Sequence, residues 1–262
     1  MFSLGSRVRR LWLAGALGAL AVVPLSLAAQ SAADRIAQGD RDHAAGNAPS
    51  ALKHYEEALA LDPKSYDALV KATREAVDVG EYNPDEGERD RLYTAAEQYA
   101  RRAVEVNPGD AEGHFELSRA LGRKALSLGK RDQVRYAGDV RKEALEALRI
   151  NPKHPGALHV MGRWNYEILR LNGLVRMFAR TVLGGAVFGE ANWDAAQHYL
   201  EQAVALEPNR IVHHLDLARV YAARDNKERA RQEYEAAIKA QPTEFNDRRY
   251  QDEARREIED VR

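Results

Sequence analysis

The chain has 262 residues, with 39 Lys and Arg against 40 Asp and Glu and a formal net charge of -1. This even balance argues against nucleic acid as the main partner, because phosphate binding needs a clustered positive excess. Cysteine is absent, which excludes disulfides, thiolate metal sites and cysteine nucleophiles. An apolar fraction of 45% excludes a globally disordered chain.

The N-terminal segment carries the features of an export signal. Three arginines among the first ten residues precede an apolar run over residues 11–23, and small residues follow it. This order is typical of a secretory signal peptide, so we interpret residues 1–33 as one. The alternative is an uncleaved membrane anchor through residues 11–29, which are mostly apolar. The predicted location is periplasmic or secreted, or anchored to the inner membrane if the segment is retained.

The rest of the chain repeats one pattern, a helix-forming stretch of small and apolar residues that ends at a proline. Proline cannot continue a helix and pushes the preceding residue out of the α region, so each pattern predicts a helix end. Successive prolines of this kind are 45, 44, 56 and 34 residues apart, and 34 is the period of the tetratricopeptide repeat. They are Pro63, Pro108, Pro152, Pro208 and Pro242.

We therefore predict an all-α solenoid of tetratricopeptide type. It should have about five helix pairs over residues 34–242 and a charged capping helix over residues 243–262. The longer spacings exceed the basic period by 11, 10 and 22 residues, which we expect as insertions between the two helices of a pair. Small residues such as Ala196, Ala203 and Ala230 should lie where paired helices approach closely.

The second half of the chain resembles a known family. The run Gly162-Arg163-Trp164-Asn165-Tyr166-Glu167 is similar to the Gly-Arg-Trp-x-Tyr-Glu signature of the regulator of microtubule dynamics family. Residues 187–189 resemble its Phe-Gly corner, and residues 195–203 resemble its next helix.

The resemblance implies a tetratricopeptide solenoid without known catalytic residues. Animal members are tied to microtubules and to membrane contact sites, and one is thought to bind phospholipid through its repeat domain. An exported chain with this N-terminus looks like a bacterial envelope relative, for which a microtubule role is not expected.

Arginine recurs eleven residues after four of the helix-ending prolines, at the ninth position of each first helix. First helices line the concave face of such solenoids, and helical spacing places the residues four before and three after each arginine on that face. The planar guanidinium suits carboxylate or phosphate groups. The predicted groove residues are Arg74, Arg119, Arg163, Arg219, Phe115, His159 and Tyr166.

Two interpretations of these arginines stay open. One is an anion-binding groove. The other is a ladder of ordinary helix ion pairs, worth about 0.2–0.5 kcal/mol each, because Glu116, Glu167 and Asp216 lie three or four residues from an arginine. Arg74 has only the adjacent Glu75, which we expect to face elsewhere.

Residues 174–190 form an apolar insertion with two arginines and a Gly-Gly break. We expect it to be an extra helix and turn that packs into the stack. The alternatives are a lid over the groove and an element that lies on a membrane surface.

Catalytic motifs are missing from the sequence. The eight histidines show no metal-binding spacing, and neither a phosphate-binding loop nor a nucleophile elbow is present. We therefore predict a non-enzyme without cofactor or metal. The predicted function is a binding or scaffold protein of the cell envelope, whose concave groove takes a protein or peptide with acidic groups. The alternative is a carrier of phospholipid or a small anion.

Overall fold

The computed structural model describes residues 31–128, 130–171 and 189–261 of the chain. These residues form eleven α-helices and a final 3-10 turn, and none of them forms a strand. The elements are α1 (Ala32–Ala44), α2 (Ala48–Leu61), α3 (Tyr66–Glu81), α4 (Glu86–Val106), α5 (Ala111–Ser127), α6 (Lys130–Ile150), α7 (Pro155–Arg170), α9 (Trp193–Leu206), α10 (Ile211–Ala223), α11 (Lys227–Lys239), α12 (Asp247–Glu257) and η2 (Ile258–Val261).

Local polar residues set where these helices begin. At the start of α1 the Ser31 hydroxyl accepts a hydrogen bond from the backbone N–H of Asp34, and the Asp34 carboxylate accepts one from the backbone N–H of Ser31. This capping box satisfies two N–H groups that a helix start leaves unpaired. Asp85, Asp110 and Asn192 cap α4, α5 and α9 through their side chains.

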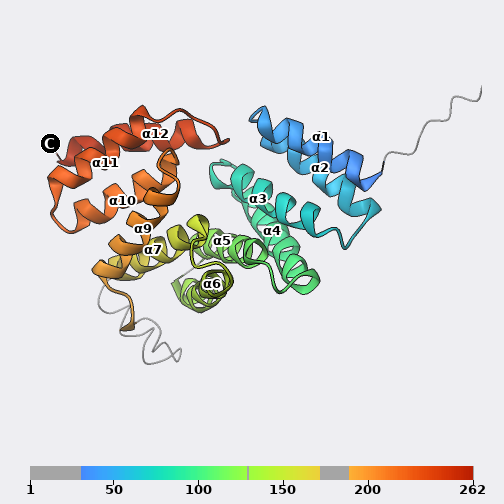
Figure 1. Cartoon of the computed structure of the whole chain (residues 1–262), viewed down its shortest axis with the longest axis horizontal. Coiled ribbons are helices and arrows are strands. Elements are labelled where there is room, and N and C mark those ends of the chain that lie inside the picture. Colours follow the sequence, from blue (N-terminus) through green and yellow to red (C-terminus); the bar gives the residue numbers. More distant parts are fainter. Residues whose placement is uncertain (1–30, 129, 172–188, 262) are drawn as a thin grey trace, which may run out of the picture. The chain divides into compact units, whose positions relative to one another are not determined.

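The helices pair in chain order. In the described part α1 packs with α2, α3 with α4, α5 with α6, α7 with α9 and α10 with α11, and neighbouring pairs stack on one another (Figure 1). The second helix of each pair ends two or three residues before a helix-ending proline. The predicted all-α solenoid of tetratricopeptide type, with about five helix pairs, is confirmed.

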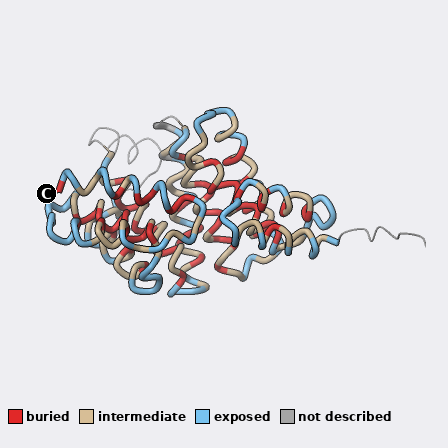
Figure 2. The backbone as a smooth tube through the Cα atoms, turned by 90° about the horizontal axis from the view of Figure 1, so that it is seen from above, coloured by how far each residue is buried: buried red, intermediate tan, exposed pale blue. Residues whose placement is uncertain are grey.

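The core runs through the stack as one small hydrophobic cluster, of Ala111, Ala147 and Ala157 between α5, α6 and α7, and three larger clusters. Of the larger clusters, one joins α2 to α5, the next joins α4 to α7, and the last joins α7 to the C-terminal elements. Figure 2 shows the buried residues following the interior of the stack while many turns and outer faces are exposed. Each helix pair therefore buries its apolar side against its neighbours, as a repeat protein requires.

Small residues allow the paired helices to approach closely. Ala196, Ala203 and Ala230 are fully buried, as expected. Between α7 and α9 a Cβ atom added to Gly162 would lie 2.5 Å from Leu200 Cγ and 3.1 Å from the backbone oxygen of Ala196. Such distances leave no room for a side chain, so glycine sets the spacing of this pair.

The expected place of the first two insertions is wrong. In the pairs α3–α4 and α5–α6 the extra residues lengthen the helices, which have 16, 21, 17 and 21 residues against 13 each in α10 and α11. After Gly87 no glycine or proline interrupts α4, so a helix can continue where an inserted loop was expected. The third insertion does lie between two helices, α7 and α9, but residues 172–188 are outside the described part.

The C-terminal segment packs against the last helix pair. Tyr250 and Ala254 of α12 belong to the same buried cluster as Leu217 and Tyr221 of α10. The Gln251 amide donates hydrogen bonds to three backbone carbonyls at the end of α11. This arrangement satisfies carbonyls that the end of a helix leaves free.

Residues 1–30, which carry most of the predicted export signal or anchor, are outside the described part. Among the helices that are described, none combines the length and the apolar character needed to cross a membrane.

Candidate functional site

The four predicted arginines occupy one position in four first helices. Arg74, Arg119, Arg163 and Arg219 are the ninth residues of α3, α5, α7 and α10. We call them the arginine column. All four line cavities on the side of the stack that the first helices form.

Two cavities share this side. The large cavity, of about 1060 Å³, is lined by three of the column arginines and by Phe115 and His159. The small cavity, of about 630 Å³, takes Arg219 and Tyr166 and also borders Arg163. The predicted residues therefore lie on one face of the solenoid, but they are distributed over two cavities.

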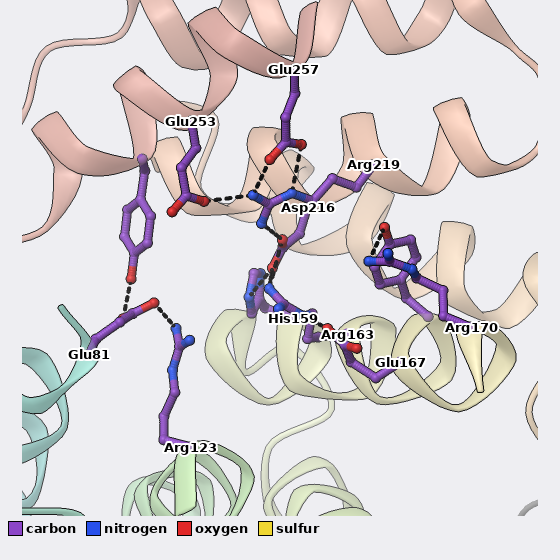
Figure 3. Close-up of polar contacts among 12 residues, drawn as sticks. Glu81, Arg123, His159, Arg163, Glu167, Arg170, Asp216, Arg219, Glu253 and Glu257 are labelled. Atoms are coloured by element: carbon purple, nitrogen blue, oxygen red, sulfur yellow. Dashed lines mark hydrogen bonds and ion pairs between the residues drawn. The ribbon is translucent and has the colours of Figure 1, made fainter. Parts of the chain in front are cut away.

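Asp216 joins two arginines of the column (Figure 3). Its carboxylate accepts hydrogen bonds at 2.9 Å from Arg163 on α7 and at 2.9 Å from Arg219 on its own helix. The Asp216 side chain is only 2% exposed. Burial by itself would raise its pKa, but Arg163, His159 and Arg219 outweigh burial and hold the pKa well below the usual range.

The last arginine of the column binds the C-terminal helix. Besides Asp216, Arg219 donates to Glu253 at 2.6 Å and to Glu257 at 2.5 and 2.9 Å (Figure 3). The two glutamates lie one helical turn apart on α12. Two glutamates of the chain's own C-terminal helix thus already occupy the end of the column.

Arg119 is shared by two acids. It pairs with Asp78 of α3 and, at 3.4 Å, with Glu116 of its own helix. One turn later Arg123 pairs with Glu81 of α3 at 2.6 Å. These contacts tie α5 to α3 by charge.

Arg74 corrects an expectation from the sequence. Its Nε donates to the adjacent Glu75 at 3.0 Å, although neighbouring residues on a helix were expected to point apart. The Glu75 carboxylate is buried and also lies 2.9 Å from His43 Nδ1 of α1. The long arginine side chain bends back to reach it. Every arginine of the column therefore has at least one acidic partner.

One pairing register recurs between neighbouring first helices, from the ninth residue of one to the sixth residue of the next. Asp40 of α1 pairs in this register with Lys71 of α3 at 2.9 Å, and α7 is joined to α10 in the same way. Between the neighbouring first helices α5 and α7, the sixth residue of α7 is Val160, which carries no charge. No acid therefore meets Arg119 from that position, and Val160 lines the large cavity there.

Phe115 and His159 both line the large cavity, and each lies against the ring of a histidine. Phe115 lies against His154, with ring centroids 4.8 Å apart. His159 stacks on His213 at 4.8 Å and places its Nε2 3.2 Å from Asp216. Burial lowers the pKa of His213 well below its usual value, so this ring is neutral at physiological pH.

Tyr166 is mostly a core residue. Its ring belongs to the buried C-terminal cluster and meets Trp193 edge-on at 6.1 Å. The guanidinium of Arg170 lies 5.2 Å from the ring centroid, and its Nη1 donates to the Tyr166 hydroxyl at 3.2 Å. Little of this side chain is available to a ligand.

An apolar wall continues the large cavity beyond the arginines. It comes from α5, α6 and α7, whose side chains also form the middle core cluster. Its members are Leu126, Ala137, Val140, Val160, Trp164, Ile168 and Leu171. The lining of the large cavity thus combines charged and apolar side chains.

Acids outnumber arginines at the α3–α5 step, and one of them resists ionisation. Glu116 is 1% exposed, and burial raises its pKa to about 7 although Arg119 favours the charged form. Burial also raises the pKa of Asp78. The two carboxylates compete for one arginine.

This raised pKa predicts how stability depends on pH. Because folded Glu116 holds its proton up to about pH 7 and the unfolded residue releases it near pH 4.5, the free energy of unfolding should fall as pH rises between these values. Between pH 5 and pH 8 the free energy of unfolding of Glu116→Gln should therefore fall by about 2–3 kcal/mol less than that of the wild type. Urea unfolding at several pH values measures it. Glu105→Gln on the exposed surface is the control, and equal pH profiles for the two variants would contradict the assignment.

Several residues of this face were not predicted from the sequence. Arg123 lies one turn after Arg119, so helical spacing could have found it. Asn246 and Tyr250 come from the C-terminal segment and border the large cavity, and no pattern in the sequence places them there. Among the described residues no group of three or more His, Asp or Glu side chains could hold a metal ion.

Comparison with known proteins now identifies the family. The sequence model of the regulator of microtubule dynamics protein 1-3 family matches residues 31–262. The chain belongs to this family.

Individual relatives are distant from this member of the regulator of microtubule dynamics family. The bovine and human regulators of microtubule dynamics protein 1 are each 24% identical to it over 141 residues, which is 54% of this chain. The chain thus spans less than half of those proteins, 43% and 44% of their length. A thermophilic TPR protein of Thermus thermophilus superposes with a TM-score of 0.61 at 22% identity, over 86% of this chain and 98% of that one. This likeness supports the fold.

Proposed function

We propose that this family member is a non-catalytic binding protein, and that the large cavity takes a segment of a protein partner that carries acidic groups. The observation that most supports this proposal is the cavity itself. It holds about 1060 Å³, lies along the first helices of the solenoid, and combines column arginines with the rings of Phe115 and His159. Arginine and aromatic side chains are the residues on which protein interfaces most depend.

The ion pairs define how an acidic partner would bind. Since each column arginine already has an acidic partner, a carboxylate of the ligand would exchange with an internal one. Glu253 and Glu257 on Arg219 give an internal example of two carboxylates from one helix bound to the column. Because Val160 stands where the register would otherwise place an acid of α7 against Arg119, we place the ligand between Arg119 and Val160.

Filling the cavity tests this proposal without breaking an ion pair. Val160→Trp should place an indole in the large cavity and remove binding of the partner, whereas Leu61→Trp on the exposed end of α2, 56% exposed, should leave it unchanged. Tagged wild type and both variants are used to capture partners from extracts of cells that make the protein. Capture of the same partner by wild type and Val160→Trp, both folded by circular dichroism, would contradict the proposal.

A second function is favoured by the apolar wall. A cavity lined by arginines together with apolar side chains such as Trp164 and Ile168 suits a phospholipid or another amphipathic anion. Native mass spectrometry of the purified protein should then show a lipid mass that Val160→Trp lacks. A ligand-free spectrum before and after incubation with phospholipid vesicles would count against a lipid carrier and leave the protein partner.

We also propose that the protein acts in the cell envelope. The support is the basic and apolar pattern of residues 1–33. A microtubule role, which the names of the relatives state, is outside this proposal because an exported chain does not meet cytoplasmic microtubules. Fractionation of cells that make the protein tests the location, and a protein found wholly in the cytoplasmic fraction would contradict it.

A further inference from the structure

The C-terminal segment contacts a helix that lies about 170 residues earlier in the chain. The Tyr82 hydroxyl, just after α3, donates to Glu253 of α12 at 2.7 Å. The Tyr250 hydroxyl of α12 donates to Glu81 at the end of α3 at 2.6 Å (Figure 3). These bonds join the second helix pair of the solenoid to its C-terminal helix.

Further contacts strengthen the same junction. The Asn246 amide, just before α12, donates to the backbone carbonyl of Asp78 at 2.8 Å. Tyr82 and Tyr250 meet edge-on at 5.9 Å, and the guanidinium of Arg249 lies 5.0 Å from the Tyr82 ring centroid. All of these interactions involve side chains rather than packed helix backbones.

The junction crosses the face that carries the cavities. Asn246 forms part of the lining of the large cavity, and Tyr250 lines both cavities, together with Arg123 and Arg163. Tyr250 therefore stands at the boundary between them. The α3 side of the junction lines the cavities as well, through Asp78 in the large one and through Glu81 and Tyr82 in the small one.

The C-terminal segment is held more firmly on one side than on the other. Toward α10 and α11 it has the buried cluster around Ala254, the Gln251 cap and the two bonds to Arg219. Toward α3 it has hydrogen bonds and the Tyr82 ring, and no aliphatic side chain of α3 joins its cluster. The α3 side should therefore release first.

One polar atom of the closed junction has no partner. Asn246 Oδ1 is buried and has no hydrogen-bond partner among the described residues, although the amide nitrogen of the same side chain donates to Asp78. A buried acceptor without a partner disfavours the state that buries it. The closed junction is therefore stabilised by several hydrogen bonds and opposed by this one atom.

We propose that this junction is a latch that regulates entry to the groove, a step that rests on the proposed function of the groove. The latch consists of Asp78, Glu81 and Tyr82 on the α3 side and Asn246, Tyr250 and Glu253 on the C-terminal side. When it opens, the C-terminal segment stays on α10 and α11, the helix pairs on the two sides of the junction move apart, and the large cavity, which is already partly open in the closed state, becomes wider. Small rotations between repeats suffice for such a movement.

Two spin labels can measure the opening, because the chain has no cysteine of its own. Lys53→Cys on α2 and Lys227→Cys on α11 are exposed label positions. The latch variant combines Tyr82→Phe with Tyr250→Phe and so removes only the two latch hydroxyls. In this variant double electron–electron resonance should show a longer distance between the two spin labels, one that is weak or missing in the protein with an intact latch. Tyr99→Phe removes a hydroxyl bond to Glu56 outside the latch and should leave the distances unchanged.

A single thiol in the cavity gives the second readout. The reaction of Val160→Cys with a maleimide that carries a polyethylene glycol chain should be about tenfold faster in the latch variant than in the Tyr99→Phe control. An unchanged distance distribution, or an unchanged reaction rate, in a latch variant that is folded by circular dichroism would overturn the latch. Neither readout uses a ligand, so a missing ligand with both effects present would count against the proposed function alone.

Discussion

Asp216→Ala is expected to lower the free energy of unfolding by about 3–5 kcal/mol. The carboxylate is 2% exposed and accepts hydrogen bonds from Arg163 and Arg219. Its loss leaves the Arg163 and Arg219 side chains, which are only 27% and 16% exposed, with one compensating charge fewer. Removing one partner of a buried ion pair costs far more than the pair contributes, because the remaining charge stays desolvated. Urea unfolding followed by circular dichroism measures the difference.

A surface ion pair provides the matched control. Asp194 is 88% exposed and pairs with Arg224 at 2.7 Å, so Asp194→Ala should cost about 0–1 kcal/mol. If Asp216→Ala costs no more than this control, the arginine column is not held by a desolvated carboxylate. In that case the column arginines could bind a carboxylate of the ligand without first giving up an internal acidic partner.

Leu200→Ala is expected to cost about 2–5 kcal/mol, because the side chain is fully buried between α7, α9 and α10 and its loss leaves a cavity. Gly162→Ala should cost about 1–3 kcal/mol although alanine is the better helix former, since its Cβ would lie 2.5 Å from Leu200 Cγ. The two effects have one cause, the close approach of α7 and α9.

A double-mutant cycle separates this cause from others. With Leu200→Ala in place the added methyl of Gly162→Ala no longer meets Leu200, and only its 3.1 Å approach to the Ala196 backbone oxygen remains. The double variant should therefore be more stable than the sum of the two changes predicts, by about 1–3 kcal/mol. Gly138→Ala is the control, because a Cβ there meets nothing within 4 Å, and it should stabilise the protein by about 0.5–1 kcal/mol. Additive effects at Gly162 and Leu200 would show that the helices do not meet as described.

The helix pairs could be predicted because their signals are local. A proline ends each second helix, and buried alanines such as Ala203 recur at helical spacing in the sequence. The ninth-position register of the arginines follows from the same repeat. The lengthened α4 could not be predicted, because a period of 34 residues gives no information on whether added residues extend a helix or form a loop.

The partners of the arginines depend on how neighbouring repeats stack, and the sequence does not determine that. Glu116 was expected as an ordinary surface partner of Arg119, but in the fold Arg119 also reaches Asp78 on the preceding pair. Arg74 was expected to lack a partner and bends to Glu75. Such contacts need the distance between two helices, which helical spacing along one helix does not supply.

The C-terminal segment shows the same limit more strongly. Its charge predicted a polar cap on the last pair, and α12 does pack there. Its bonds to Glu81 and Tyr82 join residues about 170 positions apart. They arise only because the repeats bring α3 back toward α12. The site and its proposed regulation therefore depend on the curvature of the stack.

Photo-crosslinking from inside the large cavity tests the central claim, that this face binds the ligand, most directly. A benzoylphenylalanine placed at Val160 in the cavity, or at Leu61 on the exposed end of α2, is irradiated in extracts of cells that make the protein, and the adducts are identified by mass spectrometry. We predict one dominant adduct, a protein segment or a lipid, from Val160 and none of the same mass from Leu61. The same adducts from both positions, or none from Val160, would contradict the account.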